Sequence, residues 1–443
     1  MMNPWNNRMF SLLDLFSSAK KKSIGLQMNA SLSKFDIANL KGTTMKALPI
    51  VFLFSIACLF LVKTAWAQEE YISPPSKTLT VVPFSLAAES IVLVRGILIG
   101  HADTLTFILD TGSSGISLDS TTASSLNLVP EESDINIRGI AGVKKALFLY
   151  NQSLKLNELV IDSLNFHIND YEFLSYVYGT QIDGVIGYSL FSRYILKIDY
   201  DVREIEICSQ GPIKYPRGGH LLRPFIRTLP VQSARIRDHR RVTSRFLFDI
   251  GAGLSLVLSQ EFEQDSSLIR KKRKRFPVQA HGVGGKLTMD MTLVKDFRLG
   301  PYRFRKVPTM IFEDEYNITS YPYLGGLIGN QILKRFNVIL NYDRREIYLK
   351  PNTLYREPFE YSYSGMELYY IDKVIVIGSI VKDSPADVAG FKEGDVVVAI
   401  DNNAGQDFVQ YKKALMTAKK QIKLIIRRDA ELMEIRLKLL RLR

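Results

Sequence analysis

The sequence predicts a mainly β protein in which two similar β lobes face one another across a pseudo-twofold axis, followed by a small α+β domain. Three observations predict this: an internal repeat, an Asp-x-Gly turn in each copy, and a change of pattern after residue 354. Apolar and polar residues alternate along much of both copies, as they do in strands that bury one face.

The internal repeat is clearest between residues 184–207 and 326–349. Nine of the 24 aligned positions are identical at an offset of 142, the distance from Gly187 to Gly329. Self-similarity of this kind indicates two copies of one structural unit. Each segment is typical of a strand, an Asp-centred turn and a second strand, and a short helix is expected within each segment, at 191–194 and at 332–336.

The repeat also pairs two aspartates. "FILDTGSSG" (107–115) aligns with "FLFDIGAGL" (246–254), which sets Asp110 against Asp249. A lone Asp in a Gly-rich turn is usually a turn residue, but a pseudo-twofold axis would bring this pair together. Like charges so close cannot both ionise easily, so the pair would share one proton. The ionised carboxylate could activate a water and the protonated one could hydrogen-bond a peptide carbonyl, with no metal or cofactor.

These motifs resemble the retropepsin-like aspartic proteases, fused into a two-lobed single chain of the pepsin type, over roughly residues 75–350. The resemblance implies that Asp110 and Asp249 are catalytic. Ile250 departs from it, because the family usually has Thr or Ser there and the paired hydroxyls interlock the two turns. Thr111 can contribute to that interlock and Ile250 cannot. The resemblance further implies dyad support from Thr111, Gly112, Ser113, Gly251, Ala252, Gly187 and Gly329, and flaps at Gly139, Gly142, Gly282 and Gly285.

The C-terminal part has a different pattern. A strand precedes Ser384 and Pro385, which are expected to open a short helix as N-cap and N1 residue, and Gly390 is expected to end it. A second helix is expected over 407–420, then two strands. The pattern resembles a PDZ domain of the kind linked to bacterial proteases. That resemblance implies a peptide-binding loop at Ser364, Gly365, Met366, Glu367 and Leu368; a spacer or a dimer surface is the alternative.

The N-terminal segment is typical of secretion. From Met45 a basic residue, an apolar run over 47–62 and Ala65-Trp66-Ala67 follow one another, which predicts cleavage after Ala67. The alternative is an uncleaved anchor. Met45 is the expected start, and the protein is expected in the periplasm or cell envelope. The predicted divisions are 1–67 for the extension and signal, 70–215 and 216–354 for the lobes, and 361–443 for the PDZ domain.

The composition excludes several other classes of protein function. The net charge is +13, and the run Arg270–Arg275 is interpreted as a solvated loop rather than a nucleic-acid patch. Two cysteines exclude a disulfide framework, and five scattered histidines give no zinc motif. We therefore expect no metal, no cofactor and no nucleic-acid partner, and membrane contact only through an uncleaved N-terminal segment.

The combined prediction is an exported aspartic endopeptidase whose PDZ domain binds a substrate or partner peptide. Two alternatives stay open: a peptide-binding protein on a protease fold that has lost catalysis, and a membrane-anchored scaffold. The presence of both aspartates favours the enzyme.

Overall fold

The computed structural model describes residues 73–443 except 140–141, 283–284, 316–321, 360–361, 417–420 and 442–443. The predicted signal, its cleavage after Ala67 and the start at Met45 lie outside the described residues. No helix in the described part of the chain is long and apolar enough to span a membrane.

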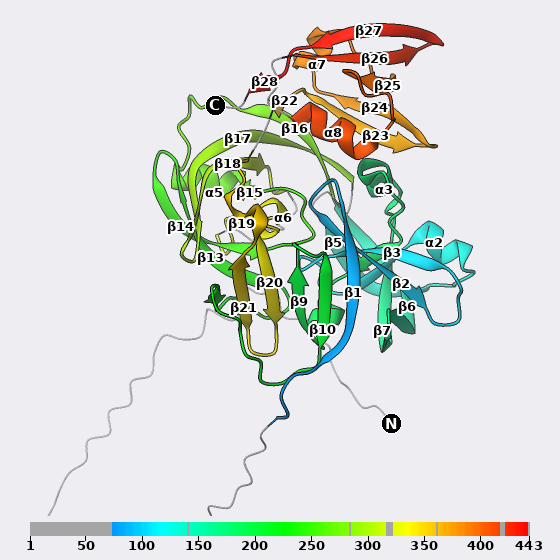
Figure 1. Cartoon of the computed structure of the whole chain (residues 1–443), viewed down its shortest axis with the longest axis vertical. Helices are drawn as coiled ribbons and strands as arrows, with labels where there is room; N and C mark the ends of the chain where they lie inside the picture. The colour runs from blue at the N-terminus through cyan, green and yellow to red at the C-terminus, as the bar shows by residue number, and fades with distance from the viewer. Residues whose placement is uncertain are drawn as a thin grey trace, which may run out of the picture. The chain divides into compact units, whose positions relative to one another are not determined.

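Two β lobes follow one another along the chain (Figure 1). The first contains β1 (Thr78–Ala87), β2 (Ile91–Leu98), β3 (Thr104–Leu109), β4 (Ile116–Asp119), α2 (Ser120–Ser125), β5 (Glu131–Gly139), β6 (Gly142–Leu156), β7 (Leu159–Asn169), α3 (Glu172–Tyr178), β8 (Gly184–Ile186), α4 (Tyr188–Phe191), β9 (Ile195–Asp199) and β10 (Glu204–Cys208). The second contains β11 (His220–Leu222), β12 (Phe225–Ile226), β13 (Pro230–Arg237), β14 (Arg241–Phe248), β15 (Leu256–Ser259), α5 (Gln260–Ser266), β16 (Phe276–Gly282), β17 (Gly285–Leu299), β18 (Tyr302–Phe312), β19 (Gly326–Ile328), α6 (Asn330–Leu333), β20 (Phe336–Asn341) and β21 (Glu346–Pro351).

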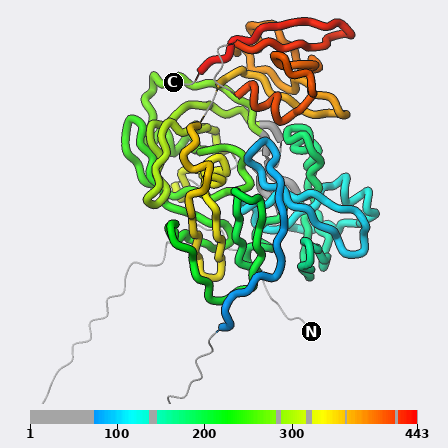
Figure 2. The backbone as a smooth tube through the Cα atoms, viewed as in Figure 1, coloured from blue at the N-terminus to red at the C-terminus, as the bar shows by residue number. Residues whose placement is uncertain are grey.

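A shared sheet joins the lobes in the strand order β11-β21-β20-β9-β10-β1. Figure 2 shows the yellow trace of β20 and β21 beside the green trace of β9 and β10. At the junction Lys197 pairs with Ile339, its own repeat equivalent at the offset of 142 (339 − 197). The residues on either side of this pair are matched crosswise: each pairs with the repeat equivalent of the residue on the other side of Lys197. The pseudo-twofold axis predicted from the repeat therefore passes between β9 and β20.

The same arrangement of strands precedes each aspartate. β3 runs parallel to β8, with Leu109 opposite Ile186, and β14 runs parallel to β19, with Phe248 opposite Ile328. β4 and β15 then return antiparallel to β8 and β19. Each Asp-x-Gly turn is thus held by a short apolar strand that is followed directly by a glycine, Gly187 or Gly329, as the repeat predicted.

Both short helices begin earlier than expected. α4 begins at Tyr188 and α6 at Asn330, directly after Gly187 and Gly329. The helices start there because the turns at these glycines bond to the aspartate loops: the Tyr188 N–H donates to Ser113 O (3.0 Å) and the Asn330 N–H to Ala252 O (2.7 Å). The expected ranges 191–194 and 332–336 were therefore placed too late.

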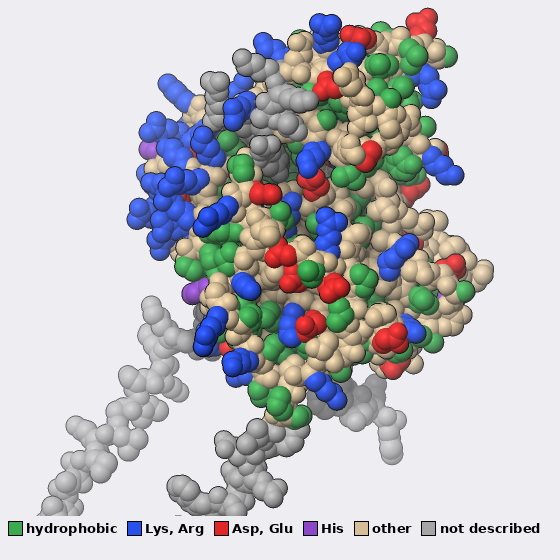
Figure 3. Space-filling view, viewed as in Figure 1, with side chains coloured by type: hydrophobic (Ala, Val, Ile, Leu, Met, Phe, Trp, Pro, Cys, Tyr) green, Lys and Arg blue, Asp and Glu red, His purple; other side chains and the backbone are tan. Residues whose placement is uncertain are grey.

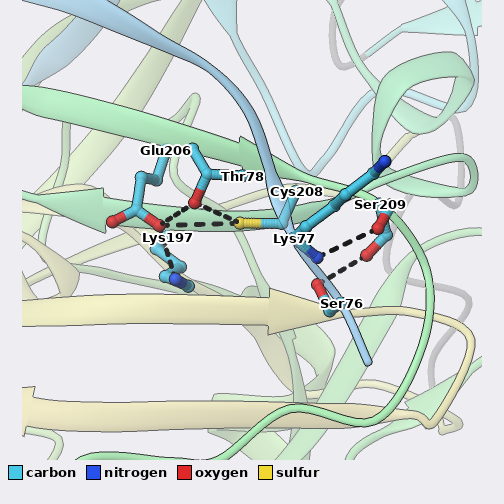
Figure 4. Close-up of polar contacts among 7 residues, drawn as sticks. All are labelled: Ser76, Lys77, Thr78, Lys197, Glu206, Cys208 and Ser209. Atoms are coloured by element: carbon cyan, nitrogen blue, oxygen red, sulfur yellow. Dashed lines mark hydrogen bonds and ion pairs between the residues drawn. The ribbon is translucent and has the colours of Figure 1, made fainter. Parts of the chain in front are cut away.

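Polar contacts fix the start of the first strand against β10 (Figure 4). Thr78 donates to Glu206 (3.0 Å), which also pairs with Lys197, and Ser76 donates to Ser209 O (2.7 Å). Cys208 lies in this cluster, buried and free, and burial raises the pKa of its thiol. A protonated, buried thiol is a packing residue rather than a nucleophile.

A smaller α+β domain completes the described chain. Its elements are the 3₁₀ helix η1 (Thr353–Arg356) in the linker, β22 (Ser362–Tyr363), β23 (Met366–Ile371), β24 (Val374–Ile380), α7 (Pro385–Val388), β25 (Val396–Ile400), α8 (Phe408–Met416), β26 (Ile422–Arg428), β27 (Glu431–Leu437) and β28 (Leu440–Arg441). Ser384 caps α7 by accepting from the Asp387 N–H, and Gly390 follows its end with φ +87°, as the sequence predicted. β23 is an edge strand of the sheet β23-β24-β25-β26-β27.

The basic run at 270–275 lies in a loop, but it is only partly solvated. Arg273 makes two hydrogen bonds of 2.7 and 2.8 Å to buried Asp238, and Arg275 pairs with buried Glu263 at 2.8 Å. Since breaking a buried pair leaves an uncompensated charge, these arginines hold the loop in place.

Candidate active site

The two aspartates lie at equivalent points directly after buried strands, Asp110 after β3 and Asp249 after β14. The Asp110 N–H donates to Ile186 O and the Asp249 N–H to Ile328 O, both at 2.9 Å. The strands β8 and β19 therefore fix the backbone from which each carboxyl group projects.

Backbone N–H groups orient both carboxyl groups. Asp110 Oδ1 accepts from Gly112 at 2.6 Å, while Asp249 Oδ1 accepts from Gly251 at 2.9 Å and from Ala252 at 3.1 Å. The two carboxyl groups also lie close together, because a Cβ atom at Gly112 would be 2.6 Å from Asp249 Oδ2 and 3.1 Å from Asp110 Oδ1. Two buried carboxyl groups this close cannot both ionise easily, so the pair favours sharing one proton.

The electrostatics of the two carboxyl groups differ. Burial raises the pKa of Asp110, and its hydrogen bonds from Asp249 and Gly112 oppose that rise. Burial and the charge of Asp110 raise the pKa of Asp249 well above its usual range. Both shifts favour a pair that holds one proton between the two carboxyl groups and titrates as a unit.

Glycine is required at two positions of the turns. A Cβ atom at Gly112 would lie 2.6 Å from Asp249 Oδ2, and one at Gly251 would lie 2.3 Å from Asp110 Cγ. Each glycine thus lies against the carboxyl group of the opposite lobe, and any side chain there would push the two groups apart.

A single threonine interlocks the two turns. The Thr111 hydroxyl donates to Phe248 O at 2.7 Å and accepts from the Ile250 N–H at 3.0 Å, and all of these atoms are buried. Ile250 is buried in the core and has no hydroxyl to return the contact. The interlock is therefore one-sided, as the sequence predicted.

The remaining support residues lie where the repeat places them. A Cβ atom at Gly187 would lie 2.4 Å from Ser113 O, and one at Gly329 would lie 2.2 Å from Leu254 O. These close approaches pack the apolar-apolar-Gly segments directly under the aspartate turns.

The four glycines predicted to form flaps lie at the tips of two hairpins. Gly139 pairs with Gly142 at the end of β5 and β6, and Gly282 pairs with Gly285 at the end of β16 and β17. The residues between each pair lie outside the described part of the chain, so the hairpins are established and their role as flaps stays a prediction.

Several residues around the pair were not singled out from the sequence. The Asn330 side chain donates to Ser90 O of the first lobe (2.5 Å) and accepts from the Tyr200 hydroxyl (2.9 Å), and the Ser90 hydroxyl donates to Gly253 O (3.1 Å). Asn330 follows the repeat glycine Gly329 directly, and this position in the repeat was the sequence signal that could have identified it. This network ties the β1–β2 turn to the Asp249 turn.

The charge of the aspartate pair affects the pKa values of two tyrosines. Burial raises the pKa of Tyr178 and of Tyr342, and the carboxyl groups of Asp110 and Asp249 add to the effect in both. Glu367 of the C-terminal domain also contributes at Tyr178. Tyr178 therefore lies in the electrostatic environment of both the aspartate pair and the C-terminal domain.

The predicted peptide-binding loop leads into the edge strand β23. Gly365 has φ +75° and a Cβ atom there would lie 2.1 Å from Ser384 Cβ, so the loop packs against the start of α7. Ser364 Oγ accepts from the Met366 N–H at 3.2 Å. That N–H is already bonded within the loop, while Glu367 and Leu368 lie in β23 itself.

The first lobe contacts this domain through α3, which lies beside β23 (Figure 1). Lys412 of α8 donates to Val177 O at 2.7 Å, and Phe173 contacts Tyr369 of β23 edge-on, with ring centroids 5.2 Å apart. At the end of α3 a Cβ atom on Gly179 would lie 2.4 Å from the Phe408 ring. The last turn of α3 thus packs where β23 and α8 face one another.

Comparison with known proteins agrees with this architecture. The family described as aspartyl protease matches residues 94–190 and 232–332, one stretch in each lobe, and the PDZ domain family matches residues 376–428. A crystal structure of the aspartic proteinase from Irpex lacteus is similar at 12% identity, covering 63% of this chain and 98% of that one, with a TM-score of 0.39. No curated protein matches the sequence.

The shared sheet, the paired Asp-x-Gly turns and the two family matches together define the class. The chain is a two-lobed, retropepsin-like protein of the aspartic protease fold with a C-terminal PDZ domain.

Proposed function

We propose that this protein is an exported aspartic endopeptidase that cleaves peptide bonds with Asp110, Asp249 and one activated water. The observation that carries the proposal is the buried pair of carboxyl groups at equivalent turns of the two lobes, where Gly112 lies against Asp249 and Gly251 against Asp110, and where burial raises the pKa of both. Such a pair supplies a general base and a general acid at one point without a metal. The secretory pattern at 45–68 supports export.

In the proposed reaction Asp110 takes a proton from the water as that water attacks the peptide carbonyl. Asp249 donates its proton to the carbonyl oxygen, which stabilises the charge that develops there. The proton on Asp110 then passes to the leaving amine as the C–N bond breaks. One hydroxyl of the tetrahedral intermediate returns its proton to Asp249 as the carboxyl product forms, which restores the starting state of the pair. The N–H groups of Gly112, Gly251 and Ala252 keep both carboxyl groups oriented throughout.

Cleavage of a mixed peptide library by the chain from residue 68 onward tests the proposal. The wild type is expected to cut internal peptide bonds, and Asp110→Asn to lower the rate by about 10²–10⁴-fold, the usual contribution of a general base. Asp343→Asn, which alters an exposed carboxylate in a repeat turn, is the matched control and should behave as wild type. Protein recovered from the cell envelope is expected to begin at Gln68.

The one-sided interlock at Ile250 favours a second candidate, a peptide-binding protein without catalysis. It predicts peptide binding by wild type and Asp110→Asn alike, and no cleavage by either from about pH 3 to 8. That result would exclude the endopeptidase.

We further propose that the PDZ domain binds an extended peptide along β23, and that this peptide must displace α3. Phe173→Ser is expected to raise peptide affinity about fivefold, because an aromatic contact of about 1 kcal/mol that holds α3 in place is lost. Fluorescence anisotropy of a labelled C-terminal peptide, measured in an Asp110→Asn background to prevent cleavage, would show the change.

Tyr176→Phe is the control for this experiment, since it removes only a hydroxyl that bonds to Glu172 within α3. Equal peptide affinities for the wild type and Phe173→Ser would show that α3 does not compete with a peptide for β23.

A further inference from the structure

The outer face of the second lobe carries seven exposed arginines on four adjacent strands. The strands are β14, β13, β17 and β18, which are neighbours in the sheet through β14–β13, β13–β17 and β17–β18 pairing. We call this surface the arginine face; it consists of Arg235, Arg237, Arg241, Arg245, Arg298, Arg303 and Arg305. Figure 3 shows Lys and Arg side chains gathered over β13 and β14, on the left of the view.

The strand register places these arginines on one side of the sheet. Arg235 is directly opposite Arg298, which is directly opposite Arg303, and Arg237 is directly opposite Arg241. Directly opposite residues of antiparallel strands project to the same face, and neighbouring strands lie about 4.8 Å apart. The residues between them, such as Ile236, Phe297 and Phe304, are buried on the other side of the sheet.

Like charges directly opposite one another destabilise a sheet. The arginine face contains three such pairs in a row of four strands, and folding alone gives no reason for them. An anion that binds across the strands would relieve the repulsion.

The face has one carboxylate to offset its charge. Buried Asp296 of β17 pairs with Arg237 at 3.7 Å, with Arg298 at 3.5 Å and with Arg303. Among the described residues Arg235, Arg241 and Arg305 have no ion-pair partner. Seven positive charges and one negative charge leave a net charge of +6 on a single sheet face.

Two exposed aromatic rings adjoin the arginines. Phe225 of β12 is 56% exposed and lies opposite Val231, on the same side of β13 as Arg235. Tyr323 is 40% exposed and lies under the Arg245 guanidinium, 5.2 Å from its carbon. Exposed aromatic side chains beside a basic surface are typical of proteins that settle into the headgroup region of a bilayer.

We propose that the arginine face binds the phosphate groups of an anionic membrane. Guanidinium groups bind phosphate oxygens through paired hydrogen bonds, so a face of arginines suits phosphate groups well. A rigid sheet face presents these groups side by side to a surface of closely spaced headgroups. The binding would hold the protein at the envelope surface whether or not its N-terminal segment is cleaved.

Co-sedimentation with vesicles tests this inference with the chain from residue 68 onward. At about 0.1 M salt the wild type is expected to bind vesicles rich in phosphatidylglycerol and not vesicles of phosphatidylcholine alone. In 1 M salt, where the screening length falls to about 3 Å, binding should disappear. Replacing Arg235, Arg241 and Arg305 by threonine should weaken binding about 100-fold, at about fivefold for each arginine.

The control replaces three exposed basic residues away from the face, Arg95, Lys214 and Lys392, by threonine and should leave binding unchanged. The variant of the arginine face should unfold at the same temperature as wild type or higher, because its substitutions remove repulsion. Equal vesicle binding by both triple variants would overturn the proposal. So would tighter binding to a DNA or RNA oligomer than to the anionic vesicles.

Discussion

Asp249→Asn is expected to abolish peptide cleavage and, at the same time, to make the folded protein more stable at neutral pH. Activity is lost because an amide cannot donate the proton that the carbonyl oxygen needs, a loss of about 10²–10⁴-fold. Stability rises because the amide is neutral at every pH. Its N–H can still donate to Asp110, in place of the shared proton.

The direction of the stability change follows from the raised pKa values of the pair. Burial raises the folded-state pKa of Asp249 well above that of the unfolded chain. The carboxyl group therefore contributes full stability below the unfolded pKa, near 4, and loses that contribution as the pH rises through the folded pKa. A difference of one pKa unit corresponds to about 1.4 kcal/mol. The free energy of unfolding of the wild type should therefore drop below that of the variant as the pH rises.

Thermal unfolding of both proteins from about pH 3 to 8 measures this effect. The two unfolding temperatures should converge near pH 4 and separate toward pH 8, with Asp249→Asn the higher. Asp343→Asn should follow the wild type throughout, since that carboxylate is exposed. A variant that is less stable than the wild type at pH 8 would contradict the shared-proton geometry.

Thr111→Val should produce the second large effect, because it removes the only hydroxyl of the interlock. Val has nearly the same shape, but the Phe248 carbonyl and the Ile250 N–H would both lose their partner in a buried position. Each unsatisfied group costs about 1–3 kcal/mol, so a loss of about 2–6 kcal/mol in the free energy of unfolding is expected for the two groups. Cleavage should fall as well, because a shift of about 1 Å between catalytic groups costs about 10²-fold.

Denaturant unfolding and initial rates, with Thr111→Ser as the matched control, measure both changes. Serine keeps the hydroxyl and should stay close to the wild type. Ile250→Thr should add the reciprocal hydroxyl and be more stable than Ile250→Val. The valine variant loses a methylene group and gains no hydroxyl, which costs about 0.5–1.5 kcal/mol. If Ile250→Thr is the less stable of the two, the second turn cannot accommodate a hydroxyl.

The paired architecture was accessible from the sequence because duplication leaves two copies of each chemical constraint. Asp110 and Asp249, the close-packed glycines beside them and the pairing of the apolar-apolar-Gly segments all recur at nearly one offset. The capped helix from Pro385 was likewise predicted, since its Ser-Pro start and Gly end act through the local backbone.

Contacts that occur only once in the chain, outside the internal repeat, could not be predicted in this way. The packing of α3 on β23 and α8 depends on Val177, Gly179 and Lys412, which no local pattern connects. The arginine face depends on the register of four strands over 70 positions of sequence, from Arg235 to Arg305. Within a single strand, the arginines show only the ordinary alternation of exposed polar and buried apolar residues.

The symmetric junction of β9 with β20 has a consequence for biosynthesis. Before β20 has been made, β9 presents an unpaired edge next to β10. Because the junction is centred on Lys197 and its own repeat equivalent, the backbone of that edge is geometrically suited to pair with the β9 of a second nascent chain in the same way, opposed only by the charges of the two Lys197 side chains that would then face one another. Isologous association of half-made chains would therefore compete with completion of the monomer, and the edge is protected only once the second lobe reaches it.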